Sequence, residues 1–299
     1  MPKELKLSII YVNWNCDDEI VASIASVRRW SIGVPLEILV VDNASPNGLG
    51  ELEWAEDIVL IRSSVNGGFG AGCNLGAKRA QGRYLLFLNP DTRFLNDVAN
   101  LLIEFIESHP LVAAVGPRVE DAEGQVLYEG GRSLPTLSTE FLVHSTLAFR
   151  FPQGKVTSRP LLSRWDHQST REVEAILGAC MLIPAEVFKA VGGFDESFFL
   201  YCEELDLCLR MRESGLQIWY LHTARILHKE RQSTIKHFGS TNRIVLENMR
   251  SQYHYFRKHE GKLKSLIWLK MVAALYFLRY VRSREQHHLE YMKWGLAEW

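Results

Sequence analysis

The sequence predicts an α/β protein with a doubly wound, mostly parallel sheet and a helical extension at its C-terminal end. Two observations predict it: short apolar runs alternate with helix-like segments up to residue 89, and helical spacing without strands returns after residue 241. The chain has 299 residues, of which 47% are hydrophobic and 23% charged, with a formal net charge of −1. That length suits one large domain, and the balanced charge argues against a disordered chain or a surface that binds nucleic acid.

Strand-like runs organise the first part of the chain, at residues 7–12, 36–41, 58–61 and 84–88. The first run precedes a helical pattern that begins with acidic residues and ends with Arg28 and Arg29, as the helix dipole favours. A glycine-rich stretch at 66–77 opens the helix before the fourth run. Because strand-then-helix units repeat, we expect parallel strands with helices on both faces.

The rest of the chain is less regular. We expect Asn96 to cap a helix that ends at Ser108, and the weakly patterned segment 116–171 to form substrate loops or a lid. Further strands are predicted at 111–115, 172–183, 217–221 and 224–227, and further helices after Pro184, from residue 203, at 242–258 and at 262–284.

A polar break follows the fourth apolar run. Asn89-Pro90-Asp91 comes directly after five apolar residues, and proline has no N–H to continue a strand ladder. The side chains of Asn89 and Asp91 should therefore lie at the carboxyl edge of the sheet, where α/β proteins bind ligands. A carboxylate and an amide there suit Mg²⁺ or Mn²⁺ beside substrate phosphates, although the same residues also form ordinary turns.

The glycine-rich stretch allows two interpretations. Helix N-termini attract phosphate, but neither GxGxxG nor GxxxxGK[ST] occurs at this position. The glycines would alternatively permit close packing between the helix and a strand. The missing GxGxxG also disfavours an NAD-dependent oxidoreductase on the same type of sheet.

Cysteine usage and the N-terminus bear on location. There are five cysteines, an odd number, and none forms a CxxC pair, so we expect reduced thiols in a cytosolic protein. The first fifteen residues contain no signal-peptide pattern. We expect a cytoplasmic protein that is peripheral on the inner face of the cell membrane.

Taken in order, these motifs resemble the family 2 glycosyltransferases, and most of all their rhamnosyltransferase-like branch. The resemblance covers roughly residues 7–233 and rests on Asp42-Asn43, the stretch 66–76, Asn89-Pro90-Asp91, Gly178-Ala179, the turn 192–196, the carboxylates at 203–206, and His228. It implies a GT-A fold, a nucleotide diphosphate sugar as donor, a divalent cation (Mg²⁺ or Mn²⁺) and inversion at the anomeric carbon. It also implies a catalytic domain at 1–240, with a nucleotide-sugar half at 1–115 and an acceptor half at 116–240, followed by a helical extension at 241–299.

The resemblance also implies roles for individual residues. Donor binding falls on Tyr11, Asn13, Asp42, Asn66, Asn74, Asn89 and Asp91, and the acceptor side on Gly178, Ala179 and Asp195. Asp91 and His228 would hold the metal, and Asn89 replaces the first Asp of the family's DxD motif. The alternatives are a helix cap for Asp42 and a core or surface histidine for His228.

Three carboxylates open the helix that begins at residue 203. Glu204 matches the family's catalytic base, and Glu203 and Asp206 lie beside it. Successive helical residues are about 100° apart, so the three side chains cannot all face the cleft. The alternative is that all three only complement the positive end of the helix dipole.

The resemblance predicts an inverting transferase that moves rhamnose from dTDP-rhamnose to a hydroxyl of a glycan or lipid-linked glycan in cell-surface polysaccharide synthesis. Alternatives are a transferase that uses a UDP- or GDP-sugar, and an inactive nucleotide-binding module that acts by interaction. We expect no nucleic-acid partner. The sequence allows either a monomer or a homo-oligomer.

The pattern of residues in the last long helical segment predicts that this helix contacts a membrane surface. Residues 266–281 are apolar apart from Lys270 and Arg279, but sixteen helical residues reach only about 24 Å, against a hydrocarbon core of about 30 Å. Lys264, Arg279 and Arg282 lie within roughly 60° of one another on the helix and form a basic edge. The alternative is that this helix packs on the catalytic domain or on a second subunit.

Overall fold

A computed structural model of the chain describes residues 5–46, 57–229 and 241–297. It divides into two compact units: unit 1 comprises Met1–Arg132 and Asp166–His237, and unit 2 comprises Ser133–Trp165 and Phe238–Trp299. The sequence did not predict that 133–165 belongs with the C-terminal helices. The predicted boundary at residue 240 lies outside the described residues and stays a prediction.

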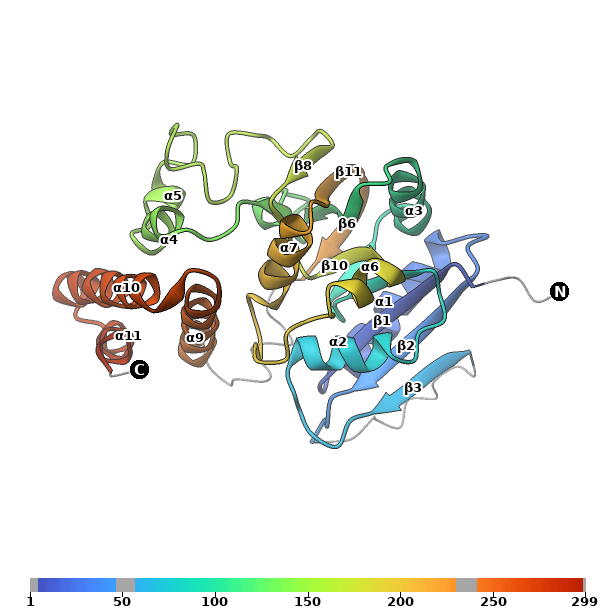
Figure 1. Cartoon of the computed structure of the whole chain (residues 1–299), viewed down its shortest axis with the longest axis horizontal. Coiled ribbons are helices and arrows are strands. Elements are labelled where there is room, and N and C mark those ends of the chain that lie inside the picture. Colours follow the sequence, from blue (N-terminus) through green and yellow to red (C-terminus); the bar gives the residue numbers. More distant parts are fainter. Residues whose placement is uncertain (1–4, 47–56, 230–240, 298–299) are drawn as a thin grey trace. The chain divides into compact units, whose positions relative to one another are not determined.

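Unit 1 is built on a nine-stranded sheet in the order β3-β2-β1-β4-β10-β6-β11-β5, with β8 paired to β11 (Figure 1). Its strands are β1 (Leu7–Asn13), β2 (Leu36–Asp42), β3 (Ile58–Arg62), β4 (Tyr84–Leu88), β5 (Thr92–Phe94), β6 (Val112–Glu120), β8 (Arg171–Val173), β10 (Cys180–Pro184) and β11 (Gln217–His228). A small second sheet pairs β7 (Gly131–Arg132) with β9 (Ala175–Ile176), and a short 3₁₀ turn, η1 (Tyr128–Gly130), precedes it. This arrangement confirms the predicted α/β class.

Parallel pairing holds strands β3, β2, β1 and β4 together, and β6 and β11 also run parallel. Between these two groups β10 runs antiparallel to both of its neighbours. Parallel strands end at the same edge of a sheet, so the carboxyl ends of β1, β2 and β4 share one edge.

Helices cover both faces of the sheet in unit 1. They are α1 (Asp17–Trp30), α2 (Phe69–Ala77), α3 (Val98–Ser108), α6 (Ala185–Ala190) and α7 (Glu203–Glu213). Buried residues of α1 and α3 share one core with alternate side chains of β1 and β4, such as Ile9 and Leu86. Helix α2 packs on the opposite side chains of β1, where Ile10 and Val12 lie (Figure 1). Because both faces are covered, the central strands are apolar almost throughout.

The predicted strand at 172–183 forms three short strands. Only the last of them, β10, enters the middle of the main sheet, while β9 pairs with β7. The break falls at Leu177-Gly178-Ala179, where the chain passes beside α7. The two strands predicted at 217–221 and 224–227 are instead one strand, β11, with a register shift between Leu221 and Arg225.

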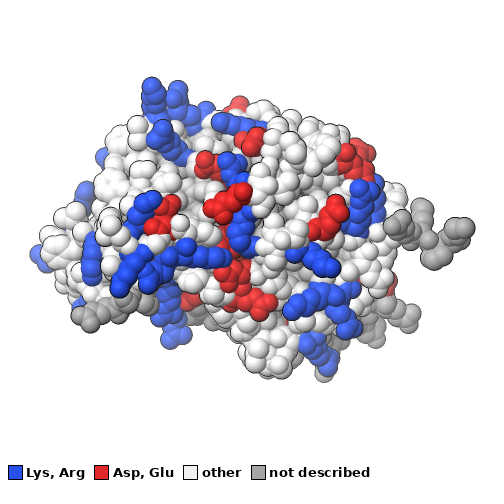
Figure 2. Space-filling model, in the orientation of Figure 1, with Lys and Arg blue, Asp and Glu red and all other residues white. Residues whose placement is uncertain are grey.

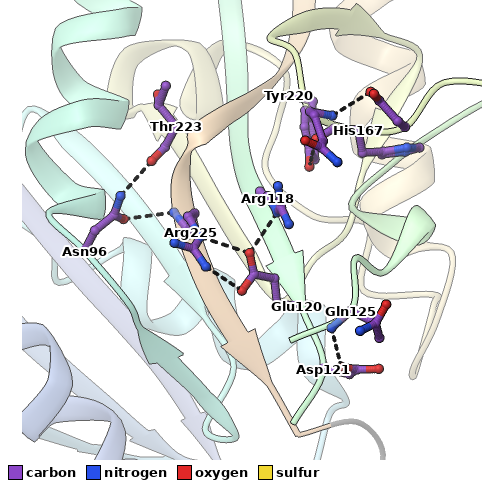
Figure 3. A network of polar contacts seen from close by, with 11 residues as sticks. Asn96, Arg118, Glu120, Asp121, Gln125, His167, Tyr220, Thr223 and Arg225 are labelled. Carbon is purple, nitrogen blue, oxygen red and sulfur yellow. Dashed lines mark hydrogen bonds and ion pairs between the residues drawn. The ribbon is translucent and has the colours of Figure 1, made fainter. Parts of the chain in front are cut away.

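Polar contacts hold this irregular part of β11 (Figure 3). The Asn96 side chain accepts a hydrogen bond from Arg225 N at 2.9 Å and donates to Thr223 O at 2.7 Å. Asn96 therefore fastens β11, and the N-cap position of α3 is Asp97, not Asn96 as predicted. The Arg225 guanidinium also donates to both carboxylate oxygens of buried Glu120, at 2.9 and 3.0 Å. These bonds fix the ends of β6 and β11 relative to each other.

Unit 2 is helical. Its helices are α4 (Leu137–His144), α5 (Leu147–Arg150), α9 (Thr241–His259), α10 (Gly261–Ser283) and α11 (Gln286–Leu296). Trp268 of α10 is fully buried and stacks on Phe256 of α9, with 5.9 Å between the ring centroids. Arg279 donates a hydrogen bond to the carbonyl of His144 at the end of α4. Within the described residues, no helix is both long and apolar enough to cross a membrane.

Candidate active site

Asp91 and His228 meet at the carboxyl edge of the sheet. Asp91 precedes β5, and His228 is the last residue of β11, paired with Thr92. His228 Nε2 lies 3.3 Å from Asp91 Oδ1, and Lys229 N donates to Asp91 O at 3.0 Å. Asp91 is 2% exposed, and its Oδ1 atom and His228 Nδ1 are buried without a hydrogen-bond partner. Buried polar atoms are normally paired, so a bound ligand or cation would complete this pair.

Asn89 and Glu204 are brought to neighbouring positions by the short segment Gly178-Ala179. Asn89 N donates to Ala179 O at 2.9 Å. A Cβ atom added to Gly178 would lie 3.4 Å from Glu204 Cβ, so this glycine faces the Glu204 side chain. The predicted acceptor-side residues Gly178 and Ala179 therefore connect the predicted base to the Asn-Pro-Asp turn.

The three carboxylates at the start of α7 have different surroundings. Glu204 Oε1 accepts a hydrogen bond from Arg132 Nη2 at 2.9 Å. Asp206 is fully buried and paired with Arg210, at 2.7 Å from Nη2. Arg210 also donates hydrogen bonds to the carbonyls of Val191 and Gly193, in the turn that follows α6. By holding Arg210, Asp206 supports that turn. Glu203 is 5% exposed, and its Oε2 atom is buried without a partner.

The electrostatics of Glu203 follow from this burial. Burial and the neighbouring Glu204 carboxylate raise the pKa of Glu203 well above its ordinary value, and Arg132 opposes the rise. Burial and the charge of Glu203 likewise raise the pKa of the Cys73 thiol on α2. Glu203 is therefore a carboxyl group that keeps its proton more readily than an exposed glutamate does.

Three predicted donor-binding residues lie at or near the ends of β1 and β2. Asn13 is buried, donates to Asp17 Oδ1 at 2.6 Å and accepts from Cys16 N, so it also fixes the start of α1. Asp42 is 6% exposed and accepts from Ser45 N at 3.3 Å.

Tyr11 points into the core instead of toward the edge. Its hydroxyl pairs with Ser23 Oγ at 2.9 Å, and burial raises its pKa. The structure therefore brings Asn13 and Asp42 to the edge but not the Tyr11 side chain.

The glycine-rich stretch packs closely at two of its glycines. A Cβ on Gly72 would lie 2.7 Å from Val12 Cγ1, and one on Gly76 would lie 2.5 Å from Ile10 Cγ2. These distances confirm the close-packing interpretation at Gly72 and Gly76. Asn66 lies at the beginning of the stretch, where its Oδ1 accepts from Asn43 Nδ2 at 2.9 Å and from Gly68 N at 3.0 Å.

Asn74 and Asp195 both serve the turn that follows α6. Asn74 Nδ2 donates to Phe194 O and to Glu196 Oε1, each at 2.9 Å, and its Oδ1 accepts from Phe194 N. Asp195 Oδ1 accepts from Ser197 N at 2.9 Å. Asn74 thus holds two elements that are 120 residues apart in the chain. The predicted donor role of Asn74 and acceptor role of Asp195 stay predictions.

The backbone before Glu203 is strained. Tyr201 and Cys202 adopt left-handed conformations, with φ of 69° and 66°, which are uncommon for residues other than glycine. Phe199 O in the same loop accepts a hydrogen bond from Phe69 N at 3.0 Å. Consecutive strained residues cost of order 1–3 kcal/mol each and concentrate at functional sites. Here Tyr201 and Cys202 set the direction in which the first turn of α7 begins.

Sequence reasoning missed Arg132. It lies in the irregular segment 116–171, in a two-residue strand, and no local pattern marks it. The sequence shows only that Arg132 follows the glycine pair Gly130-Gly131, which does not indicate a role. Its relation to Glu204 depends on the pairing of β7 with β9, which links distant parts of the chain.

Comparisons with known proteins identify the family of this chain. The profile of glycosyl transferase family 2 matches residues 8–166, more than half of the chain. A mannosyltransferase from Pyrobaculum calidifontis, solved with GDP-Man and Mn²⁺, superposes with a TM-score of 0.59 at 11% identity, covering 97% of this chain and 84% of that one. The fold and the family profile together define a glycosyltransferase of the GT-A type. The chain belongs to glycosyl transferase family 2.

Two rhamnosyltransferases are similar to this chain in sequence. One is the N-acetylglucosaminyl-diphospho-decaprenol L-rhamnosyltransferase of Mycobacterium tuberculosis, 28% identical over 213 residues, or 67% of this chain and 68% of the relative. The other is the rhamnosyltransferase WbbL of Escherichia coli K12, 27% identical over 188 residues, or 60% of this chain and 68% of the relative. They support the predicted rhamnosyltransferase-like branch.

Proposed function

We propose that the protein transfers rhamnose from dTDP-rhamnose to a hydroxyl group of a glycan or lipid-linked glycan in cell-surface polysaccharide synthesis. The names of the two bacterial relatives support the sugar, and one of them acts on a diphospho-decaprenol acceptor. The observation that carries the proposal is the edge at which Asp91 and His228 meet, with the segment Gly178-Ala179 connecting Asn89 to Glu204.

A divalent cation fits this edge. Asp91 Oδ1 has no hydrogen-bond donor, and His228 Nε2 lies 3.3 Å from it, so these two atoms would supply one oxygen and one nitrogen ligand. Mg²⁺ and Mn²⁺ are usually bound by one or two protein ligands together with substrate phosphates. When bound, the cation would neutralise charge on the donor diphosphate, and Asp91 and His228 would hold it.

The reaction requires one base. The acceptor oxygen would form a bond to the anomeric carbon on the face opposite the diphosphate, while the carbon–oxygen bond to the diphosphate breaks and leaves its electron pair on that oxygen. Glu204 would accept the proton of the acceptor hydroxyl. A positioned base of this kind contributes about 10² to 10⁴ in rate. Displacement from the opposite face inverts the anomeric carbon.

A membrane surface is a further partner that the structure of unit 2 supports. Helix α10 buries one face within the unit, and a second apolar face is exposed. Exposed apolar residues of that face are Leu263, Ile267, Phe277, Leu278 and Val281. At about 100° per residue they lie within about 100° of one another, with exposed Lys270 among them and Lys264 and Arg282 at one side.

Arg279, predicted to lie on the basic edge, instead bonds to His144 within the unit. Figure 2 shows Lys and Arg side chains between uncharged patches over this unit. An apolar stripe with flanking cations suits an anionic lipid surface, which is also where a lipid-linked acceptor would be found.

Two other candidate functions make different predictions for ligands. An inactive nucleotide-binding module would bind a nucleotide sugar and never turn it over. A UDP- or GDP-sugar transferase would be stabilised most by that donor.

A thermal-shift screen tests the proposal. We expect dTDP-rhamnose with Mn²⁺ to raise Tm more than UDP- or GDP-sugars do, because a ligand that binds only the folded state stabilises it by mass action. The variant Asp91→Ala should remove the Mn²⁺-dependent part of the shift. A larger shift with a UDP- or GDP-sugar would contradict the proposed donor, and equal shifts with Mn²⁺ and with EDTA would contradict the metal.

A further inference from the structure

We propose that Arg132 is a positioning residue for Glu204, which fixes one carboxylate oxygen so that the other is presented to the acceptor hydroxyl. The inference rests on the proposed function, in which Glu204 is the base. It assigns a role to an arginine that the sequence motifs of this chain do not include.

The geometry of the pair is well defined. Arg132 Nη2 lies 2.9 Å from Glu204 Oε1, and the two side chains are 25% and 8% exposed. In the described part of the chain, Arg132 is the one residue whose side chain donates a hydrogen bond to Glu204. A charge-assisted bond with so little exposure is stronger and less screened than a surface ion pair. One oxygen of the predicted base is therefore held, and its second oxygen is not.

Both partners are confined by the backbone around them. Arg132 belongs to β7 and lies opposite Ala175 of β9, so a paired strand carries it. On the other side, a Cβ atom added to Gly178 would lie 3.4 Å from Glu204 Cβ and 3.7 Å from Glu204 Cγ, so the glycine faces this side chain. The Glu204 side chain thus lies between a glycine that leaves room for it and an arginine that orients its carboxylate.

A purely structural role explains Arg132 poorly. Its Nε atom is buried and has no hydrogen-bond partner. An arginine retained only for stability would be expected to satisfy its buried donors, because each unpaired buried donor costs about 1–3 kcal/mol. By contrast, Arg210 satisfies its donors with Asp206 and two carbonyls of the neighbouring turn.

Among the charged groups around Glu204, Arg132 is the cation that pairs with the Glu204 carboxylate. Asp206 is already paired with Arg210 and does not compete for it. The titratable and charged groups nearby are Glu203, Cys73 of α2, Cys208 and Arg212 of α7, and Arg132 itself. Loss of Arg132 would leave the neighbouring carboxyl groups of Glu203 and Glu204 without the positive charge that opposes their repulsion. This pair of carboxyl groups would then keep a proton to higher pH.

A double-mutant cycle tests the inference with dTDP release from dTDP-rhamnose as readout, in which water takes the place of the acceptor hydroxyl, bonds to the anomeric carbon and gives its proton to Glu204. The variants are Arg132→Gln, Glu204→Gln, the double variant, Arg132→Lys and the control Arg212→Gln, which removes an arginine from α7 that pairs with Glu172. We expect Arg132→Gln to lower kcat about 10- to 100-fold with the KM for donor little changed. In the Glu204→Gln background the same change should cost less than about threefold, because the two residues act as a unit.

Two further readouts separate positioning from folding. The acidic limb of the pH–rate profile should move to higher pH in Arg132→Gln and stay in place in Arg212→Gln. Arg132→Lys, which keeps the charge, should restore part of the rate.

The outcomes that overturn the inference differ from those that overturn the proposed function. Equal losses from Arg132→Gln in both backgrounds, an unchanged rate, or an unshifted pH profile would exclude a role through Glu204. If Glu204→Gln itself turns over the donor at the wild-type rate, the base assignment fails. If the wild-type protein releases no dTDP, the donor assignment fails, and the role of Arg132 falls with either.

Discussion

At the scale of single residues, the site combines polar atoms that are satisfied with a few that are not. Asp206 and Asn74 have partners that explain their burial, whereas Asp91, His228 and Glu203 each keep a buried atom without a hydrogen-bond partner. Such atoms cost stability, and at Asp91 and His228 a bound ligand would complete them.

Glu203→Gln should stabilise the protein in a pH-dependent way. The pKa of Glu203 is raised, so the folded protein holds a proton that the unfolded chain has released at the same pH. Stability is therefore lost as pH rises above the ordinary glutamate pKa, by up to about 1.4 kcal/mol per pH unit. We expect the gain in Tm from Glu203→Gln to be at least about 3 °C larger at pH 8 than at pH 4.

Glu213→Gln, which changes an exposed glutamate of the same helix, is the matched control and should show no such trend. A gain that is equal at both pH values would mean that Glu203 titrates normally.

Asp91→Ala should abolish Mn²⁺-dependent binding of dTDP-rhamnose, and His228→Ala should weaken it about tenfold. A hard cation that is held mainly by substrate oxygens tolerates loss of a nitrogen ligand better than loss of its carboxylate. Isothermal titration with Mn²⁺ and with EDTA measures both effects. His222→Ala, on the same strand but bonded to Thr170, is the control; if it weakens binding as much as His228→Ala does, the effect belongs to the strand and not to the site.

Roles for individual residues could be proposed from the sequence only where a motif marks them. The sequence indicated Asp91, Glu204 and His228 because their order and spacing are typical of the family. It did not indicate Arg132, whose position depends on the pairing of β7 with β9, nor that the Tyr11 hydroxyl faces Ser23 in the core.

At the scale of elements, the start of α2 contacts the loop before α7, the helix that carries Glu204. Gly68 has φ of 89°, and a Cβ there would lie 2.0 Å from Phe199 O. Gly124 has φ of 77° with nothing within 4 Å of its Cβ position, so it provides a control for the backbone conformation alone.

We expect Gly124→Ala to cost about 1 kcal/mol and Gly68→Ala at least twice that, because the second must also move the loop that leads to Glu203. Thermal unfolding measures both costs. Equal losses from the two substitutions would show that the loop does not depend on this contact.

The central strands were predictable because burial on both faces leaves a continuous apolar run, as in β4. The segment 116–171 was not, because its helices α4 and α5 are short and the chain there contributes to both units. Strand direction was also beyond the sequence: β10 runs antiparallel between two groups of parallel strands, and an apolar run has the same composition in either direction.

At the scale of the whole molecule, exposed apolar side chains concentrate in unit 2. Phe277 is 48% exposed and Leu278 62%. We expect the wild-type protein to float with vesicles that contain phosphatidylglycerol at low salt, and Phe277→Ser/Leu278→Ser to stay in the soluble fraction. Both residues lie on the exposed face of α10, so their substitution leaves the buried face around Trp268 intact.

Ile32→Ser/Leu111→Ser removes exposed apolar side chains from unit 1 and serves as the control. Wild-type protein that does not float, or equal loss of flotation in both double variants, would contradict a membrane role for α10.

The central claim is that this chain is a glycosyltransferase whose base is Glu204, and one comparison tests it most directly. dTDP-rhamnose binding and dTDP release are measured with Mn²⁺ in wild-type protein and in Glu204→Gln, which keeps the shape of the side chain but cannot accept a proton as a carboxylate does. We predict that the variant binds the donor within about twofold of wild type and loses at least about 10² in turnover. Turnover within a few-fold of wild type, with binding unchanged, would contradict the account and assign the proton to another group.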